Sequence, residues 1–246
     1  MTIAGLDIGS RTIALVEMDN GDIAHSEVVA TTFDPLAQCV KLLEGRDLDL
    51  LVATGYGRHL AQANFADRVV TEIKAFALGC HSIFPSCRTI LDIGGQDTKA
   101  ISLVPGGKVA DFQMNDRCAA GTGKFLEVMA TAMDLSLEEM GRIAAETESE
   151  VKISSMCTVF AESEVTGLIA RGTPRPEIAR GLHEAICDRS VSLLKRVGIE
   201  KDVVFAGGVA RNPCLRSLLE RRLGFELLIP ENPQIVGALG AALTAS

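Results

Sequence analysis

The sequence predicts an α/β protein in which two lobes, each built from a βββαβα unit, face one another across a cleft. The tetrapeptide Leu-Asp-Ile-Gly occurs at 6–9 and again at 91–94. An apolar stretch follows each copy, at 12–18 and at 98–104, and ends at a glycine turn before a third stretch of similar length. Because the same strand–turn–strand–turn–strand order appears twice, we expect two similar units in one chain.

The elements expected after the first repeat follow in chain order. The residues between the two repeats predict a helix over 35–44, a strand over 48–54 and a helix from about 72 to 84. The hairpin turns are expected at Asn20-Gly21 in the first unit and at Gly106-Gly107 in the second.

The second repeat is followed by a longer series of helices. Ser136 with Glu139 predicts a capping box, Gly198 predicts a helix stop, and Asn212-Pro213 predicts a helix start. The expected elements are helices at 119–133, 137–146, 158–171 and 176–197, a strand at 202–208, a helix from 213, a strand at 225–229 and a final helix from about 233.

Composition excludes several classes of protein. The chain has 246 residues, of which 47% are hydrophobic and 23% charged, which is ordinary for a globular protein. A net charge of −8, no Trp and one Tyr argue against nucleic-acid binding. No apolar run is long enough for a membrane helix, and the N-terminus lacks a basic signal region. We therefore expect a soluble, cytoplasmic protein without membrane contact.

Each Leu-Asp-Ile-Gly copy combines a carboxylate with a glycine turn at the end of a buried strand. Asp7 and Asp92 are suited to holding Mg²⁺ through water. The groups suited to approaching phosphate oxygens are the glycine backbones and nearby hydroxyls, namely Gly9, Gly94, Gly95, Ser10 and Thr12. One Asp-x-Gly is a common strand end, but two copies favour a split phosphate clamp.

Three further segments fit the same site. The apolar strand before Gly207 and Gly208 could support an adenosine against bare backbone. The small residues of 235–243 could pack tightly on another helix at a hinge, and 71–79 is a similar helix with Glu72 near its start.

Taken together, these segments resemble the sugar kinase/Hsp70/actin superfamily. The corresponding motifs are phosphate 1 (7–12), connect 1 (71–79), phosphate 2 (92–98), adenosine (204–209) and connect 2 (235–241). The resemblance implies an actin-like fold of duplicated ribonuclease H-like units, with ATP in the interdomain cleft and lobes that close around it. It also implies a first lobe of 1–85 plus 233–246 and a second lobe of 86–232.

The resemblance assigns roles to individual residues. Asp7 and Asp92 would lie near Mg²⁺, and Glu72 would polarise the attacking water, so these three form the expected catalytic set. The expected ATP/ADP-binding residues are Gly9, Ser10, Arg11, Thr12, Gly94, Gly95, Gln96, Asp97, Gly207, Gly208, Val209, Asn212 and Gln234.

Two cysteines, Cys118 and Cys157, each precede a predicted helix. The stretch Cys-Ala-Ala-Gly-Thr-Gly-Lys at 118–124 is not a P-loop, because that pattern needs Gly at Cys118 and Ser or Thr at Phe125. A thiolate at a helix N-terminus is stabilised by the dipole and by free N–H groups, which can also hydrogen-bond an iron–sulfur cluster. That the two cysteines fill apolar gaps is an equally good interpretation of the residues alone.

These cysteine segments, together with the nucleotide motifs, resemble the activators of 2-hydroxyacyl-CoA dehydratases, within the wider family of benzoyl-CoA reductase ATPase subunits. The resemblance implies a homodimer whose single [4Fe–4S] cluster is shared between two subunits and ligated by Cys118 and Cys157. It implies that reduced ferredoxin or flavodoxin supplies an electron. ATP hydrolysis then drives that electron into a partner iron–sulfur dehydratase or reductase.

One residue departs from the family pattern. Ala14 stands where many relatives carry Lys. If that lysine contacts phosphate, nucleotide binding is altered here, but we expect the residue on an exposed strand face without catalytic consequence.

Several interpretations stay open. The ATPase could instead serve a benzoyl-CoA reductase or a double-cubane cluster protein. A sugar kinase of the same fold would use Asp111 or Asp116 as base, and an actin-like scaffold would bind no iron. The segment 55–58 could line the cleft or be a plain turn. The other cysteines are expected to pack in the interior at 39, 187 and 214, with a minor zinc alternative at 80 and 87 beside His81.

Overall fold

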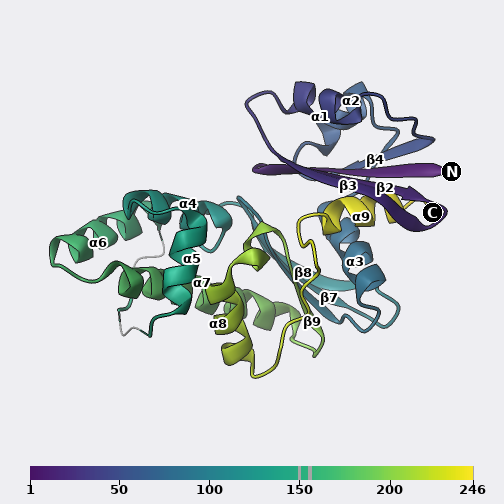
Figure 1. Ribbon diagram of the computed structural model, residues 1–246. Coiled ribbons are helices and arrows are strands. Elements are labelled where there is room, and N and C mark those ends of the chain that lie inside the picture. The colour runs from purple at the N-terminus through teal and green to yellow at the C-terminus, as the bar shows by residue number, and fades with distance from the viewer. Residues whose placement is uncertain (149–150, 155–156, 246) are drawn as a thin grey trace.

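The computed structural model describes residues 1–148, 151–154 and 157–245, and within these ranges the strands form two sheets (Figure 1). The first sheet has the order β3-β2-β1-β4-β5 and the second the order β8-β7-β6-β9. The first contains β1 Thr2–Ile8, β2 Thr12–Asp19, β3 Asp22–Ala30, β4 Leu50–Thr54 and β5 Arg68–Val69. The second contains β6 Thr89–Ile93, β7 Thr98–Leu103, β8 Val109–Asn115 and β9 Val203–Ala206.

The two sheets repeat the same pairing. The strands that carry the repeated aspartate are β1 and β6. Strand β1 pairs antiparallel with β2 and parallel with β4, and β6 pairs antiparallel with β7 and parallel with β9. Asp7 lies opposite Ala14 in the β1–β2 register, and Asp92 lies opposite Lys99 in the β6–β7 register. The predicted duplication is confirmed.

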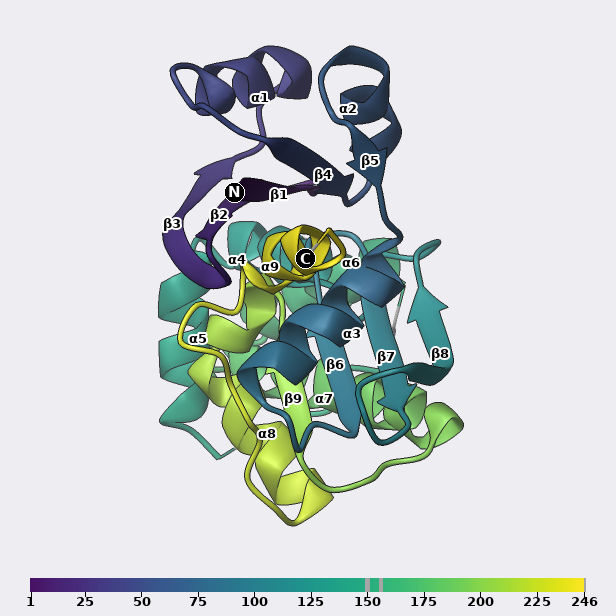
Figure 2. The same cartoon turned by 90° about the vertical axis from the view of Figure 1, so that its right-hand side faces the viewer.

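Helices form layers above, between and below the sheets. Helices α1 Pro35–Leu43 and α2 Arg58–Asn64 cover the outer face of the first sheet, and α3 Glu72–Ile83 and α9 Val236–Leu243 lie between the sheets (Figures 1 and 2). The far side of the second sheet carries α4 Gly123–Ala132, α5 Leu137–Ala145, α6 Thr158–Ala170, α7 Arg175–Val197 and α8 Pro213–Leu223. No described helix is long and apolar enough to cross a membrane.

The contact between α3 and α9 depends on small residues. A Cβ on Gly240 would collide with the carbonyl oxygen of Ala75 in α3, and a Cβ on Gly5 of β1 would collide with that of Ala238 in α9. The expected tight packing of the last helix is therefore confirmed. Since α9 packs on β1 while Phe76 of α3 packs against the second sheet, the pair of helices joins the two halves. The division of the chain into lobes at 85/86 and 232/233 stays a proposal.

The predicted helix ends are observed. The Ser136 hydroxyl accepts a hydrogen bond from Glu139 N–H (3.1 Å), and Asn212 Oδ1 accepts one from Leu215 N–H (3.0 Å) at the start of α8. Gly198 ends α7 with a φ of 80°.

Three predictions about elements were wrong in detail, and two elements were missed. Helix α4 begins at Gly123 rather than 119, because Gly121 takes a φ of +87° and Thr122 N–H turns back to Ala119 O. The stretch 225–229 makes only an isolated bridge, Val204 with Leu228. The final helix begins at Val236. Helix α2 and strand β5 were missed, since α2 is short and buries only Ala61, which leaves no apolar period to detect.

Candidate functional site

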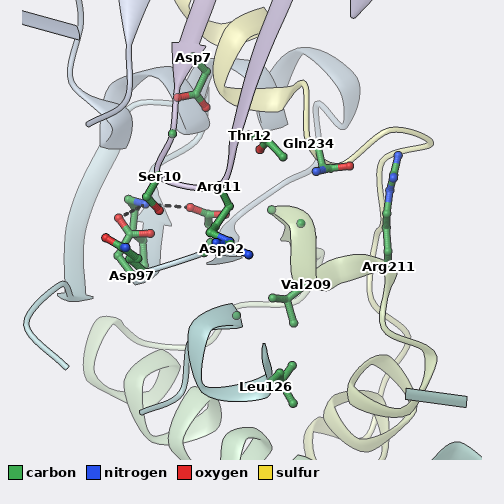
Figure 3. A pocket seen from close by; sticks show the side chains of 18 of the residues that line it. Asp7, Ser10, Arg11, Thr12, Asp92, Asp97, Leu126, Val209, Arg211 and Gln234 are labelled. Carbon is green, nitrogen blue, oxygen red and sulfur yellow. Dashed lines mark hydrogen bonds and ion pairs between the residues drawn. The ribbon is translucent and has the colours of Figure 1, made fainter. Parts of the chain in front are cut away.

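A cavity of about 1240 Å³ lies where the aspartate-bearing loops of both sheets meet α3, α4 and the segment after β9 (Figure 3). All of the residues that the sequence assigned to nucleotide or magnesium line it. They are Asp7, Gly9, Ser10, Arg11, Thr12, Glu72, Asp92, Gly94, Gly95, Gln96, Asp97, Gly207, Gly208, Val209, Asn212 and Gln234. Residues far apart in the chain are thus brought together in one place.

The two phosphate loops have the same turn and touch each other. Gly9 N–H donates to Thr12 O, and Gly94 N–H donates to Asp97 O, both at 3.0 Å. A Cβ on Gly95 would collide with Arg11, so the bare backbone of the second loop lies directly against a side chain of the first. Two glycine loops of this kind suit an oligophosphate gripped from two sides.

A glycine with positive φ supports each aspartate. A Cβ on Gly207 (φ +83°) would strike the Asp92 carboxylate and Ile93 O, and a Cβ on Gly55 (φ +87°) would strike the Asp7 carboxylate and Ile8 O. The segment 55–58 is therefore the counterpart, in the first unit, of the glycine pair after β9. Tyr56 and Arg58 from the same segment line the cavity, so of the two interpretations left open for it, the one that places it at the cleft is correct.

Lys99 carries the positive charge at the bottom of the cavity. Its Nζ lies 2.8 Å from Glu72, 3.0 Å from Asp92 and 2.7 Å from Asp97, and its side chain is only 3% exposed. Burial alone would lower the pKa of Lys99, but the three carboxylates together raise it well above its ordinary value. The lysine therefore stays charged.

The two repeated aspartates differ in their surroundings. Burial raises the pKa of Asp92, although the Lys99 ammonium opposes the shift. Burial, with the negative charge of Glu72, raises the pKa of Asp7 to about 7. Asp92 Oδ1 is buried and has no hydrogen-bond partner within the described part of the chain. Such an oxygen fits a hydrated Mg²⁺, which prefers carboxylates together with phosphates.

No group of three or more His, Cys, Asp or Glu side chains within the described ranges is arranged as a ready metal cage. Instead, three of the carboxylates gather around Lys99. A magnesium ion at Asp7 and Asp92 would need further oxygens, and those of a nucleotide are the chemically suitable source.

The second phosphate loop is bonded directly to the segment that carries Cys118. Gly123 N–H donates to Gly94 O (2.9 Å), and Lys124 N–H donates to Gly95 O (2.7 Å). The Gly-Thr-Gly-Lys stretch thus binds the neighbouring loop through its backbone. From the first loop, Arg11 reaches Glu127 of α4 at 2.6 Å.

Side chains of the second sheet hold the rest of this segment. Thr98 donates to Gly121 O (2.7 Å), and Asn115 Nδ2 donates to Cys118 O (2.9 Å). The path from the phosphate loop to Cys118 is therefore short and continuous.

The seven cysteines fall into two groups. Cys118 and Cys157 are exposed, and Cys157 is the N-cap residue of α6 as predicted. Cys118 is not at a helix head, because the turn described above separates it from α4. The others are buried, and burial raises the pKa of each thiol, at Cys39, Cys80, Cys87, Cys187 and Cys214. The expected packing role of residues 39, 187 and 214 is confirmed.

The prediction for Ala14 was wrong. The residue is 2% exposed, packs among Ile3, Val16 and Ala238, and lines the cavity opposite Asp7. It is buried because α9 covers this face of β2.

A family model described as the BadF/BadG/BcrA/BcrD ATPase family matches residues 4–245. The chain belongs to this family. As a member of the BadF/BadG/BcrA/BcrD ATPases it is an ATPase, and the prediction of an actin-like ATPase fold is confirmed.

Three comparisons place the chain within the family. It is 42% identical over 254 residues to the 2-hydroxyisocaproyl-CoA dehydratase activator of Clostridioides difficile, covering 100% of this chain and 95% of that protein. The solved structure of the activator of the 2-hydroxyisocaproyl-CoA dehydratase from Clostridium difficile with bound ADPNP superposes with a TM-score of 0.92 at 41% identity, covering 100% and 94% of the two chains. A benzoyl-CoA reductase polypeptide of Thauera aromatica is 32% identical over 208 residues, 82% of this chain and 72% of that protein.

Sequence reasoning missed several residues of this ATPase site. Lys99 and Glu127 line the cavity but carried no motif of their own. The repeat was the available signal for Lys99, since it occupies the position of Ala14 in the second copy. Asp111 and Asp116 were considered as the base of a kinase, and of the two only Asp116 lines the cavity. Asp111 lies on the exposed strand β8, where its side chain accepts a hydrogen bond from Phe112 N–H.

Proposed function

We propose that this ATPase is an ATP-dependent electron-transfer activator. It acts as a cytoplasmic homodimer that injects a low-potential electron into a partner iron–sulfur enzyme of the 2-hydroxyacyl-CoA dehydratase type. The relatives with the highest identity reported above support the partner class, because they are named as activators of such dehydratases.

The observation that carries the proposal is the backbone contact between the phosphate loop and the Cys118 segment. When Gly94 and Gly95 shift on a terminal phosphate, the N–H groups of Gly123 and Lys124 must follow, since they are hydrogen-bonded to those carbonyls. The Asn115 side chain extends the link to Cys118. ATP hydrolysis is in this way coupled to the position of an exposed thiol.

The cavity residues divide the nucleotide chemistry among them. Asp7 and Asp92 hold Mg²⁺ through water, and the glycine loops hold the phosphates through backbone N–H groups. Glu72, at the first position of α3, orients and polarises the attacking water. Gly207, Gly208 and Val209 support the adenosine.

The exposed thiols supply half of an iron–sulfur ligand set. Cys118 and Cys157 give two thiolates per chain, and a [4Fe–4S] cluster needs four, so two subunits complete the site. When bound, the cluster stores and passes one electron. Val159 and Phe160, beside Cys157, are each 67% exposed and offer an apolar surface that a second copy would cover. Reduced ferredoxin or flavodoxin is the proposed donor.

The test is purification of the full chain without oxygen. We expect a brown dimer with about four iron atoms. Cys118→Ala and Cys157→Ala should each lose the iron, whereas Cys39→Ala, a buried cysteine on the other side of the molecule, should keep it. A colourless protein that cannot be reconstituted, or a Cys118→Ala protein with its full iron content, would overturn the proposal.

The partner is a second question with its own alternative. The 32% identity to the benzoyl-CoA reductase polypeptide supports a reductase as the alternative acceptor, and a double-cubane cluster protein is a further one of the same kind. Mixing the reduced, ATP-supplied protein with each purified acceptor, and measuring which cluster becomes reduced, decides between them.

A further inference from the structure

Lys99 is a deeply buried cation of the cavity, and its contacts resemble the coordination of a metal ion. Its ammonium touches an oxygen of Glu72, Asp92 and Asp97, each from a different part of the site. Phe76 closes one side, with its ring centre 5.6 Å from Nζ. A buried ammonium is costly unless carboxylates compensate it, and here three of them converge on one atom.

The repeat shows that this cation belongs to one half only. Lys99 lies opposite Asp92 in the register of β6 and β7, and the matching position opposite Asp7 is Ala14. Asp7 therefore has no ammonium across from it. Lys99 thus pairs with Glu72, Asp92 and Asp97, while the matching position across from Asp7 is uncharged.

Lys99 already offsets much of the negative charge that would attract a free metal ion. It is paired with Asp92 Oδ2, while Asp92 Oδ1 stays buried without a partner inside the described ranges. Mg²⁺ takes six oxygens in octahedral geometry, gives up water reluctantly and usually binds through one or two carboxylates together with substrate phosphates. A hydrated ion without nucleotide would therefore meet the repulsion of the nearby ammonium with no phosphate charge to compensate it.

We infer that Lys99 is a built-in cation that keeps free Mg²⁺ out of the cavity and makes the site accept magnesium only together with nucleotide phosphates. This inference rests on the proposed roles of Asp7 and Asp92 in the nucleotide site. It goes further, because it makes Lys99 the residue that determines whether the site binds free Mg²⁺ or only Mg²⁺ with a nucleotide. Loss of the amine should leave Asp7, Glu72, Asp92 and Asp97 facing one another, and a divalent ion should then replace it.

The test measures thermal unfolding by circular dichroism against Mg²⁺ concentration, without nucleotide. The wild type and Lys74→Met, which removes an exposed lysine of α3, should show no shift of the midpoint. Lys99→Met should unfold at a lower temperature in the absence of Mg²⁺ and regain several degrees as Mg²⁺ is added, because an ion that binds only the folded state stabilises it. Lys99→Arg, which keeps the charge, should respond less than Lys99→Met.

A folded Lys99→Met protein that ignores Mg²⁺, or a wild type that binds Mg²⁺ alone, would overturn the inference. If Lys99→Met does not fold in either condition, the double variant Lys99→Met/Asp97→Asn, with one carboxylate fewer, is titrated in its place and the same criterion applies. Stabilisation of the wild type by Mg²⁺ with ATP is measured in parallel. If Mg²⁺ with ATP does not stabilise the wild type, the nucleotide role of the cavity is refuted. If it does, but the Lys99 variants show no response to Mg²⁺, only the role of Lys99 is refuted.

Discussion

Gly207→Ala should damage both folding and ATP hydrolysis, and the two effects have separate causes. Gly207 has a φ of 83° and a ψ of 171°, a region that residues other than glycine occupy at a cost of about 1–3 kcal/mol. The added Cβ would also strike the Asp92 carboxylate and Ile93 O. Overpacking of this kind costs a further ~1–3 kcal/mol.

Gly198→Ala is the matched control. Gly198 has nearly the same backbone, with a φ of 80° and a ψ of 129°, but a Cβ there would meet nothing within 4 Å. It should show the backbone cost of about 1–3 kcal/mol without the collision. The difference in unfolding free energy between the two variants, measured with urea, therefore isolates the contact with Asp92.

The hydrolysis rate tests what the collision does to function. Displacing Asp92 moves a proposed magnesium ligand, and a misplacement of about 1 Å costs on the order of 100-fold in rate. Gly198→Ala, at the far end of α7, should hydrolyse ATP at the wild-type rate once folded. A Gly207→Ala protein with no more loss of stability than Gly198→Ala, and with normal hydrolysis, would refute the reasoning.

Three further predictions concern single side chains. Arg11→Gln should weaken ATP binding about tenfold by removing a charge-assisted contact. Glu127→Gln, which frees the half-exposed Arg11 from its partner, should tighten ATP binding slightly. Calorimetric titration checks both, and weaker binding to Glu127→Gln would show that the pair itself builds the site. Burial lowers the pKa of His183 to about 4. The unfolded chain takes up the proton near pH 6.5, so the free energy of unfolding should fall by on the order of 3 kcal/mol as the pH drops from about 6.5 to 4. Urea unfolding at the two ends of that range measures the loss, and this part of it should be absent in His183→Gln. In metal-free native protein a maleimide should label Cys118 and Cys157 and spare the five buried thiols until denaturant is added, and mass spectrometry of the labelled peptides would reveal any other pattern.

The repeat explains why so much of the site could be predicted. Asp7 and Asp92 lie near the ends of buried strands whose partner strands have the same order in both sheets. The repeated tetrapeptide Leu-Asp-Ile-Gly therefore predicts where each carboxylate lies. Caps such as Ser136 and Asn212 are local signals, and they were predicted correctly because the helix end depends on the residues next to it.

The failures depend on contacts that are distant in sequence. Ala14 is buried because α9, from the other end of the chain, covers β2. The pattern of apolar residues around Ala14 does not indicate that contact. Helix α4 starts late because a turn at 119–122 precedes it, and Thr98, 23 residues before Gly121, holds that turn by donating to Gly121 O. Leu228 pairs with Val204 at one point only, so a strand-like stretch does not become a strand.

Lys99 shows how the two copies of a duplicated unit acquire different tasks. The four carboxylates Asp7, Glu72, Asp92 and Asp97 outnumber the one ammonium that is paired with three of them, so a cation that arrives with a ligand still has negative charge to offset. Without that ammonium, the carboxylates would bind any divalent ion. Ala14 opposite Asp7 and Lys99 opposite Asp92 give an intermediate balance, in which one half is satisfied and the other still lacks a cation. On the inference about Lys99, this asymmetry makes the site respond to a nucleotide that brings its own metal.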